Sequence, residues 1–297
     1  MEDSAITQKP SRLLRLEIEK VLAQFRSGIH RSMIMGRGIE LKTVRPYDPS
    51  DDMAVIDYMV SARVSEEPEL QPMSRVYYTE KEISVVTAID VGQSMALLPR
   101  KREQMLAIFW LFALSAFKSH DRFRAISFAG ERTRDSDWIP DEGTLGDMMT
   151  HGDLAIDDTS RSRGGNVFSY LAELEMRDTV LVVISDFAHV WDKEPAILRR
   201  LGMFEHNIKM IFFAIDEWSD ASPHPYGIRF FDPKQNELVF DDMRAGGDVS
   251  MRARAAAVHL KEVAQSIAQL SGVFIQIPLL ANPLDVARKE FTRMGFL

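Results

Sequence analysis

The sequence contains no cysteine among its 297 residues, so disulfide bonds, thiolate metal sites and cysteine nucleophiles are excluded. It also lacks any apolar run of the roughly 18 residues that a bilayer-spanning helix needs. The first residues, Met1 to Ser4, do not show the basic and then apolar pattern of a secretory signal. From these absences we expect a cytoplasmic protein with no membrane span.

Clusters of basic residues are absent too. The 36 Lys and Arg are outnumbered by 44 Asp and Glu, which gives a net charge of −8, and the basic residues are scattered along the chain. Nucleic-acid affinity depends on clustered Lys and Arg that neutralise phosphates, so a general nucleic-acid-binding role is excluded. What the chain does have is an apolar content of 45%, which is enough for one sizeable core.

The composition divides the chain into two segments. Residues 1–80 begin with a predicted helix from Arg12 to Arg26 and continue as a loop-rich, charged stretch with short strands and several Gly and Pro. Residues 81–297 instead alternate short apolar runs with amphipathic runs. That alternation is typical of a parallel sheet covered by helices, so we place the main domain there.

The main domain is predicted to be a Rossmann-like α/β domain, with a mostly parallel central sheet and helices on both faces. A helix from Lys101 to Lys118 has apolar residues three and four apart, and another follows Asp248 and ends at Gly272. A hairpin is predicted at Ile228–Phe231 and Leu238–Phe240, around a turn-forming sequence. The predicted sheet strands are Ile83–Ile89, Arg124–Phe128, Thr179–Ile184, Ile208–Ile215 and Val273–Ile277.

Polar residues gather where two of these strands end. Asp90 closes the first strand, Ser94 follows one turn later, and Asp186 closes another strand. Because ligands of open α/β sheets bind beyond the carboxyl ends of the strands, we expect these oxygens to converge at one edge. Asn166, which opens a helix, is a further candidate. Hard cations prefer oxygen ligands, so Asp90, Ser94, Asn166 and Asp186 form a candidate site for Mg²⁺ or another divalent cation.

A simpler interpretation is available for each of these residues. Asp90 and Ser94 can satisfy unpaired backbone N–H groups of the turn that they flank. Asn166 by itself is better explained as the N-cap of a helix beginning at Val167. Two neighbouring carboxylates repel each other, however, so Asp90 and Asp186 together favour a cation or an Arg between them.

The pattern Asp90-x-Gly92-x-Ser94 resembles the metal-ion-dependent adhesion site of von Willebrand factor A-like domains, whose core is Asp-x-Ser-x-Ser with a Thr and an Asp on later loops. Asp90, Ser94 and Asp186 match that pattern. Gly92 replaces the first Ser, so one hydroxyl ligand is lost, and Asn166 stands in place of the Thr. The resemblance implies a von Willebrand factor A-type fold with a degenerate Mg²⁺ site.

Motifs that precede the main domain narrow the resemblance. They are Gly36–Glu40, Val44–Asp52, Ile56–Tyr58 and Ser61–Arg63. In this order they are similar to the motifs of the bacterial MoxR-associated branch of von Willebrand factor A-like proteins, a family of unknown function. Ser50 and Tyr58 depart from that branch's usual Gly-Asp-Asp and Ile-Asp-Trp. The resemblance implies a non-enzymatic protein-protein interaction module whose partner is a MoxR-type AAA+ ATPase.

Five charged residues of this N-terminal segment lie among apolar and turn residues. Arg binds carboxylates in a bidentate manner, so these charges can form an internal network that stabilises the segment. The alternatives are a partner-binding surface, or a solvated loop held by ordinary turns. We favour the structural network. The residues are Arg45, Asp51, Asp52, Asp57 and Arg63.

An enzymatic alternative rests on Ser94. The sequence Gly92-Gln93-Ser94 after a strand imitates the nucleophile elbow of serine hydrolases. In an elbow the helix begins at the serine, whereas here the helix is predicted only from Lys101. We therefore expect no catalytic residue and keep a serine hydrolase as the alternative. Its candidate bases are His189, His206, His224 and His259.

Overall fold

The computed structural model divides the chain into two compact units. One unit groups Met1–Gln24 with Ile83–Gly295, and the other contains Phe25–Glu82 together with Phe296–Leu297. The predicted N-terminal segment, residues 1–80, is thus shared between the two units, and its first helix belongs with the main domain. The structure describes residues 10–24, 35–48, 53, 56–64, 72–78, 83–96, 98–154, 163–164, 167–174, 176, 178–188, 196, 199, 208–218, 228–232, 237–241 and 249–294.

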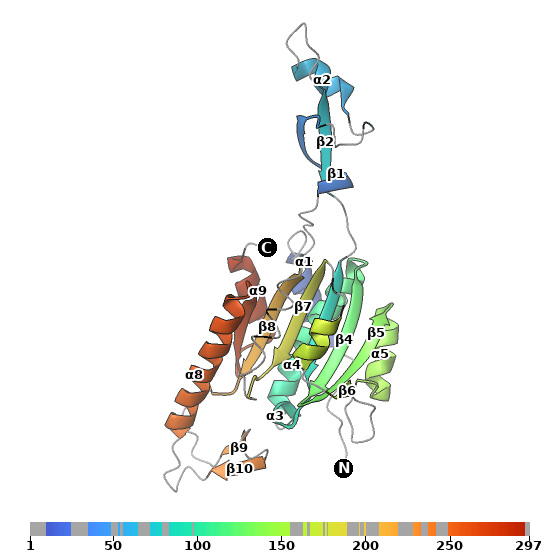
Figure 1. Cartoon of the computed structure of the whole chain (residues 1–297). Helices are drawn as coiled ribbons and strands as arrows, with labels where there is room; N and C mark the ends of the chain where they lie inside the picture. Colours follow the sequence, from blue (N-terminus) through green and yellow to red (C-terminus); the bar gives the residue numbers. More distant parts are fainter. Residues whose placement is uncertain are drawn as a thin grey trace. The chain divides into compact units, whose positions relative to one another are not determined.

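A central sheet, with seven strands in the described residues, organises the larger unit (Figure 1). The strand order is β11-β8-β7-β3-β4-β5-β6; the first five are parallel to one another, and β5 and β6 are antiparallel to their neighbours. All five predicted sheet strands are present, so the prediction of an α/β fold with a mostly parallel sheet is confirmed. The strands are β3 (Ser84–Asp90), β4 (Arg122–Ala129), β5 (Arg132–Ile139), β6 (Arg163–Gly164), β7 (Thr179–Ser185), β8 (Ile208–Asp216) and β11 (Val273–Pro278).

Two strands of the sheet were not predicted from the sequence. Only Thr133 and Ile139 of β5 are buried, so the strand shows no regular apolar alternation. Its place next to β4 is supported by the ion pair between Arg124 and Asp135, a contact between side chains of the two strands. β6 contains only two residues. The local sequence pattern was therefore insufficient to predict β5 and β6. Their place in the sheet depends on the pairing of β5 with β4 and of β6 with β5.

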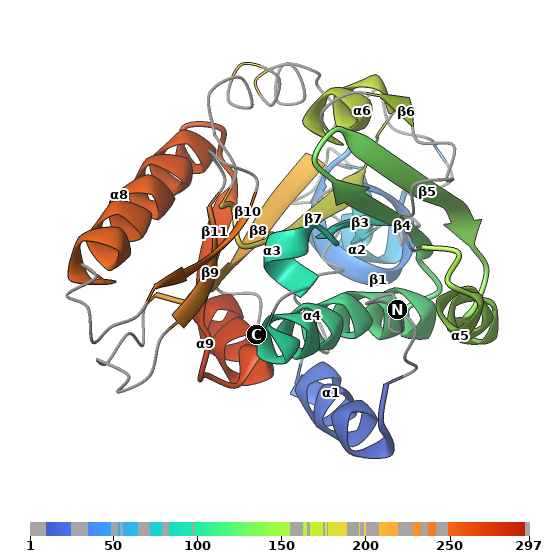
Figure 2. The same ribbon diagram turned by 90° about the horizontal axis from the view of Figure 1, so that it is seen from below.

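Helices cover both faces of the sheet (Figure 2). On one face, α6 (Val167–Glu173) and α8 (Val249–Ala268) share an apolar core with alternate residues of β3, β4, β7 and β8. The opposite face is covered by α4 (Pro99–Lys118) and α9 (Pro283–Arg293). Phe212 and Phe213 illustrate the two layers, because Phe212 belongs to the first core whereas Phe213 packs against Phe112 of α4.

α4 is the helix around which the second layer is built. It begins at Pro99, two residues before the predicted Lys101, because proline is well suited to the first position of a helix. Met105, Ile108 and Phe109 are at most 1% exposed. Phe112 makes edge-to-face contacts with Phe213 of β8 and Phe291 of α9. α4 is therefore a buried helix, and its first turn lies at the carboxyl edge of the sheet.

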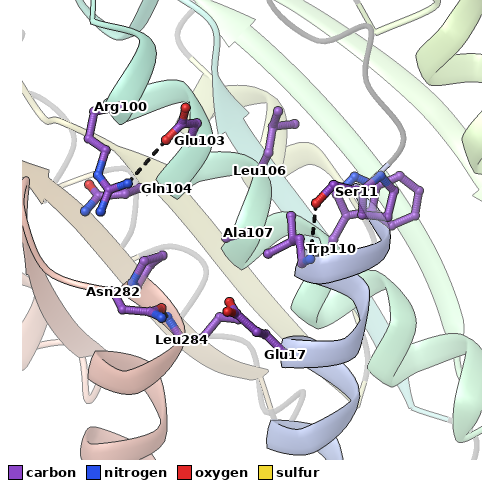
Figure 3. Close-up of a pocket in the computed structure, with 13 residues that line it drawn as sticks. Ser11, Glu17, Arg100, Glu103, Gln104, Leu106, Ala107, Trp110, Asn282 and Leu284 are labelled. Atoms are coloured by element: carbon purple, nitrogen blue, oxygen red, sulfur yellow. Dashed lines mark hydrogen bonds and ion pairs between the residues drawn. The ribbon is translucent and has the colours of Figure 1, made fainter.

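The N-terminal helix, α1 (Arg12–Gln24), packs on α4 and α9. Its residues Ile18, Val21 and Leu22 are buried. A cavity of about 460 Å³ lies where α1, α4 and α9 meet, and Figure 3 shows the Arg100–Glu103 ion pair in its wall. Because α1 packs on two helices of the main domain, it belongs to the larger unit.

The remaining described elements are short. α3 (Gln93–Ala96) follows β3, and α5 (Glu142–His151) follows β5. The predicted hairpin is confirmed as antiparallel β9 (Ile228–Asp232) and β10 (Glu237–Asp241). In the smaller unit, β1 (Met35–Pro46) pairs antiparallel with β2 (Met73–Tyr78), and α2 is Tyr58–Val64. Within the described residues, none of the helices has the length and apolarity required to cross a membrane.

The packing of α4 gives a direct prediction for stability. Replacing Phe112 with Ala removes a ring that is 2% exposed, so we expect the free energy of unfolding to fall by about 3–5 kcal/mol. Leu13→Ala is the control, because Leu13 is 68% exposed and its replacement should change stability by less than about 0.5 kcal/mol. Urea unfolding measures both. Equal losses in the two variants would contradict the described packing.

Candidate functional site

Carboxylates gather at the carboxyl edge of the sheet. Asp90 ends β3, Asp186 follows β7, Asp216 ends β8 and Glu217 comes next. The strands β3, β7 and β8 are parallel neighbours, so their carboxyl ends meet at the same edge. Asp90, Asp186 and Asp216 are all less than 9% exposed. The structure thus brings Asp90 and Asp186 to one edge, as the sequence predicts.

Lys101 supplies the positive charge of this cluster. Its Nζ lies 2.9 Å from Oδ2 of Asp186 and 2.6 Å from Oε2 of Glu217. Nζ also donates to the carbonyl oxygen of Ser94 at 3.3 Å. The three acceptors match the three protons of an ammonium group. Lys101 is 2% exposed, so its charge is almost entirely removed from water and neutralised within the protein.

Burial and charge act in opposite directions on the pKa values of this pair. Burial alone would lower the pKa of Lys101, but the charges of Asp186 and Glu217 raise it above its ordinary value. Burial alone would raise the pKa of Asp186, but Lys101 and the backbone N–H of Ala188 hold it below its ordinary value. Lys101 and Asp186 therefore form an ion pair at neutral pH.

Asp90 has a different environment from Asp186. It accepts hydrogen bonds from the backbone N–H of Gly92 at 2.8 Å and from the hydroxyl of Ser185 at 2.6 Å. Burial, together with the negative charge of Asp186, raises the pKa of Asp90 to about 7. The pKa values of the two acids thus differ because their neighbours differ: Asp186 forms an ion pair with Lys101, whereas Asp90 is bonded to Gly92 and Ser185.

This arrangement does not fit a divalent cation. A cation such as Mg²⁺ needs about six oxygen ligands, but the carboxylate oxygens of Asp186 and Glu217 already contact an ammonium group. Gly92 offers no hydroxyl, and a Cβ atom there would lie 3.0 Å from Oδ1 of Asp90. Within the described residues, no three His, Asp or Glu side chains are placed to hold a metal ion. Asn166 lies outside the described residues.

Two residues of this cluster were missed by sequence reasoning. Asp216-Glu217 repeats the strand-end pattern of Asp90 and Asp186, so the signal for Glu217 was present. Lys101 shares its helix face with Met105, Ile108 and Phe112, because these positions are three and four residues apart. A lysine in line with a buried apolar stripe is the signal that predicts an internal charge.

Ser94 lies in α3, which begins directly after Gly92. The expectation that the first helix after β3 begins near Lys101 is therefore wrong, because α3 contains Ser94 and α4 begins at Pro99. Ser94 is half-buried, and its side chain helps to lower the pKa of Asp186. In the described part of the chain no histidine ring bonds to Ser94; Nε2 of His259 lies 2.8 Å from the carbonyl oxygen of Phe187. His189, His206 and His224 lie outside that part.

Asp57 is the centre of a separate charge network, in the smaller unit. Oδ1 of Asp57 accepts from the N–H groups of Met59 and Val60, so Asp57 caps α2. Its Oδ2 lies 2.5 Å from Nε of Arg75. The Val60 N–H and Arg75 hold the pKa of Asp57 below its ordinary value.

The partner of Asp57 was not among the predicted residues. Arg75 lies on β2, beyond the predicted group of charges. Arg63 is exposed in the last turn of α2, and Arg45 donates to the carbonyl oxygen of Pro46. Asp51 and Asp52 lie outside the described residues. The structural role predicted for Asp57 therefore rests on a cap and an ion pair.

The sheet topology and the carboxylate cluster at its carboxyl edge together define the class of protein to which the chain belongs. The chain is a mixed α/β protein with a mostly parallel sheet, whose carboxyl edge carries a carboxylate cluster in which a buried lysine contacts Asp186 and Glu217. Residues 43–266 match the family described as "Protein of unknown function DUF58", and the chain belongs to this family. A comparison with curated proteins finds no match.

Several solved structures are similar to this chain. A conserved hypothetical protein BatB from Bacteroides thetaiotaomicron is 13% identical with a TM-score of 0.43, over 72% of this chain and 98% of that chain. An aerotolerance-related membrane protein from Bacteroides fragilis is 12% identical with a TM-score of 0.40, over 71% and 97%. A von Willebrand factor type A protein from Catenulispora acidiphila is 14% identical with a TM-score of 0.38, over 74% and 43%.

The raised pKa of Asp90 predicts a pH dependence of stability. Between the unfolded value of 3.8 and the folded value of about 7, the folded state holds a proton that the unfolded state has lost. Stability must therefore fall as pH rises through this window. Asp90→Asn should lose less stability than the unchanged protein between pH 5 and pH 8, by up to about 2.6 kcal/mol, because about two pH units of the shift fall inside this interval.

Urea unfolding at several pH values measures this difference. The contribution of Asp186 has the opposite sign and lies elsewhere, because its lowered pKa makes stability fall only as pH drops below about 4. Burial also raises the pKa of Glu217, which lowers stability with rising pH in both proteins, so the difference between the two profiles is what reports on Asp90. Parallel pH profiles for the two proteins would show that Asp90 is ionised throughout.

Proposed function

We propose that the protein is a non-enzymatic protein-protein interaction module of the von Willebrand factor A type, which binds a MoxR-type AAA+ ATPase in the cytoplasm. The observation that carries this proposal is that polar side chains at the carboxyl edge of the sheet bind one another. Lys101 contacts Asp186 and Glu217, and the hydroxyl of Ser185 donates to Asp90. Such pairing supports a structural edge, since an activated nucleophile needs a neighbouring base.

The choice of partner is supported by the motifs of the N-terminal segment. Gly36–Glu40 and Val44–Asp52 resemble MoxR-associated proteins, and the family match begins at residue 43. An interaction role also agrees with the composition of the chain, which lacks the basic clusters of nucleic-acid binders.

The smaller unit offers a surface suited to a protein partner. Met53, Tyr58 and Met59 are 71%, 67% and 68% exposed, and we call them, with the exposed Arg63, the α2 surface. Aromatic residues, Met and Arg are enriched in protein-protein interfaces. Exposed apolar side chains that are close in sequence favour a binding surface over a solvated loop. We therefore place partner contact on the α2 surface.

Two versions of the interaction differ in their need for metal. In one, Mg²⁺ held by Asp90, Ser94, Asp186 and Asn166 links the edge to an acidic group of the partner. In the other, the edge needs no metal and the α2 surface binds constitutively. The contacts of Lys101 with Asp186 and Glu217 favour the metal-free version. Equal affinity for nucleotide-free ATPase with and without Mg²⁺ is the expected result.

A charge placed on the α2 surface should disrupt the complex. Met59→Asp adds a carboxylate to a desolvated contact, so we expect affinity for the purified ATPase to fall at least about tenfold. Leu280→Asp is the matched control, because Leu280 is 72% exposed but lies in the larger unit after β11. Biolayer interferometry measures both variants after circular dichroism has verified their folding. Unchanged affinity of Met59→Asp would place the contact elsewhere.

The enzymatic alternative has its own test. The purified protein should not react with a fluorophosphonate probe, and Ser94→Ala should bind the ATPase as well as the unchanged chain does, because Ser94 lies in α3 and is not part of the α2 surface. Probe labelling that disappears in Ser94→Ala would establish serine hydrolase chemistry. Absence of a complex with the ATPase would reject the proposed partner.

A further inference from the structure

The contacts of Lys101 extend beyond the pairing of one acid with one base. Three oxygens from three different segments converge on Nζ: Oδ2 of Asp186 after β7, Oε2 of Glu217 after β8, and the carbonyl oxygen of Ser94 in α3. Carboxylate and carbonyl oxygens are the ligands that hard divalent cations take in proteins. The point where they meet is occupied by an ammonium group that belongs to the chain itself.

We infer that Lys101 is an internal replacement for a divalent cation, so that the edge is assembled without metal and a cation site appears only when the ammonium is removed. The inference concerns the isolated chain and does not depend on the proposed partner. It explains in one step the lost hydroxyl at Gly92, the buried carboxylates and the burial of a lysine in the first turn of α4.

Distances around Nζ support an ammonium over a metal in the present arrangement. Its contacts of 2.6, 2.9 and 3.3 Å are hydrogen-bond lengths. Mg²⁺ requires oxygens at roughly 2.1 Å in octahedral geometry, and Ca²⁺ accepts roughly 2.3–2.6 Å with flexible geometry. The oxygens would need to move least for the larger ion, so Ca²⁺ and Mn²⁺ are suitable probes.

Charge gives a second argument. With Lys101 present, Asp186 and Glu217 share one positive charge at contact distance. Without it, the carboxylates of the buried Asp186 and the half-buried Glu217 would repel one another with no counter-charge among these contacts. A divalent cation would then supply the positive charge that the ammonium provides between the two carboxylates. Water is neutral and cannot supply it.

The first experiment compares Lys101→Met with the unchanged protein. Met keeps most of the buried side-chain length without the charge. Calorimetric titration with Ca²⁺ or Mn²⁺ should detect at least about tenfold tighter binding to Lys101→Met, and millimolar ion should raise its melting temperature while leaving that of the unchanged protein within a degree. Equal ion affinity in the two proteins would overturn the inference.

A second variant separates metal binding from folding. Lys101→Met/Asp186→Asn removes one charge of each sign, so it should fold without ion and show no ion-dependent rise in melting temperature. If Lys101→Met folds only when Mn²⁺ is present, the replacement role is supported. If Lys101→Met fails to fold with or without ion while the double variant folds, Lys101 is a structural ion-pair partner only and the inference is wrong. None of these experiments measures partner binding, so a result that contradicts the inference about Lys101 does not affect the proposed function.

Discussion

A buried ammonium group between two carboxylates is the constraint on which the carboxyl edge depends. Lys101 stands in the first turn of α4, while Asp186 and Glu217 follow β7 and β8. Removing one partner of a buried ion pair typically destabilises a protein by about 3–5 kcal/mol, because the other charge remains unpaired. The start of α4 is thereby coupled to two strand ends. Since α4 organises one whole face of the sheet, the ion pair links the packing of the core to the shape of the edge.

The same constraint shapes what the edge can do. Asp186 is held ionised by Lys101, whereas burial and the charge of Asp186 keep Asp90 protonated over a wider pH range than usual. The hydroxyl of Ser185 donates to Asp90, and the backbone N–H of Ala188 donates to Asp186. The polar groups satisfy one another, which is a property of a structural edge. Three of the exposed apolar side chains in the described part of the chain, Met53, Tyr58 and Met59, belong to the α2 surface of the smaller unit.

Much of the fold could be predicted because the central strands are buried on both faces. Every residue of β7 is buried and β3 is nearly so, which makes them continuous apolar runs. The position of Asp90 and Asp186 followed from those runs, since both acids directly follow them. β5 could not be found in the same way, because it carries Arg and Asp and is stabilised by its pairing with β4. The partner of Asp57 was missed for a related reason, since Arg75 is eighteen residues away on a strand of its own.

By itself, the sequence determined the apolar periods, the turn residues and the strand-end acids, and these depend only on neighbours along the chain. The counter-charge was decided by the tertiary structure. Nothing local distinguishes Lys101 from a solvated lysine in the first turn of a helix, except that it continues the apolar stripe of Met105 and Ile108. Its ammonium meets Asp186, 85 residues away, only because α4 packs across β7 and β8. A long-range charge contact depends on which strands are neighbours, and that order is set by the packing of the whole sheet.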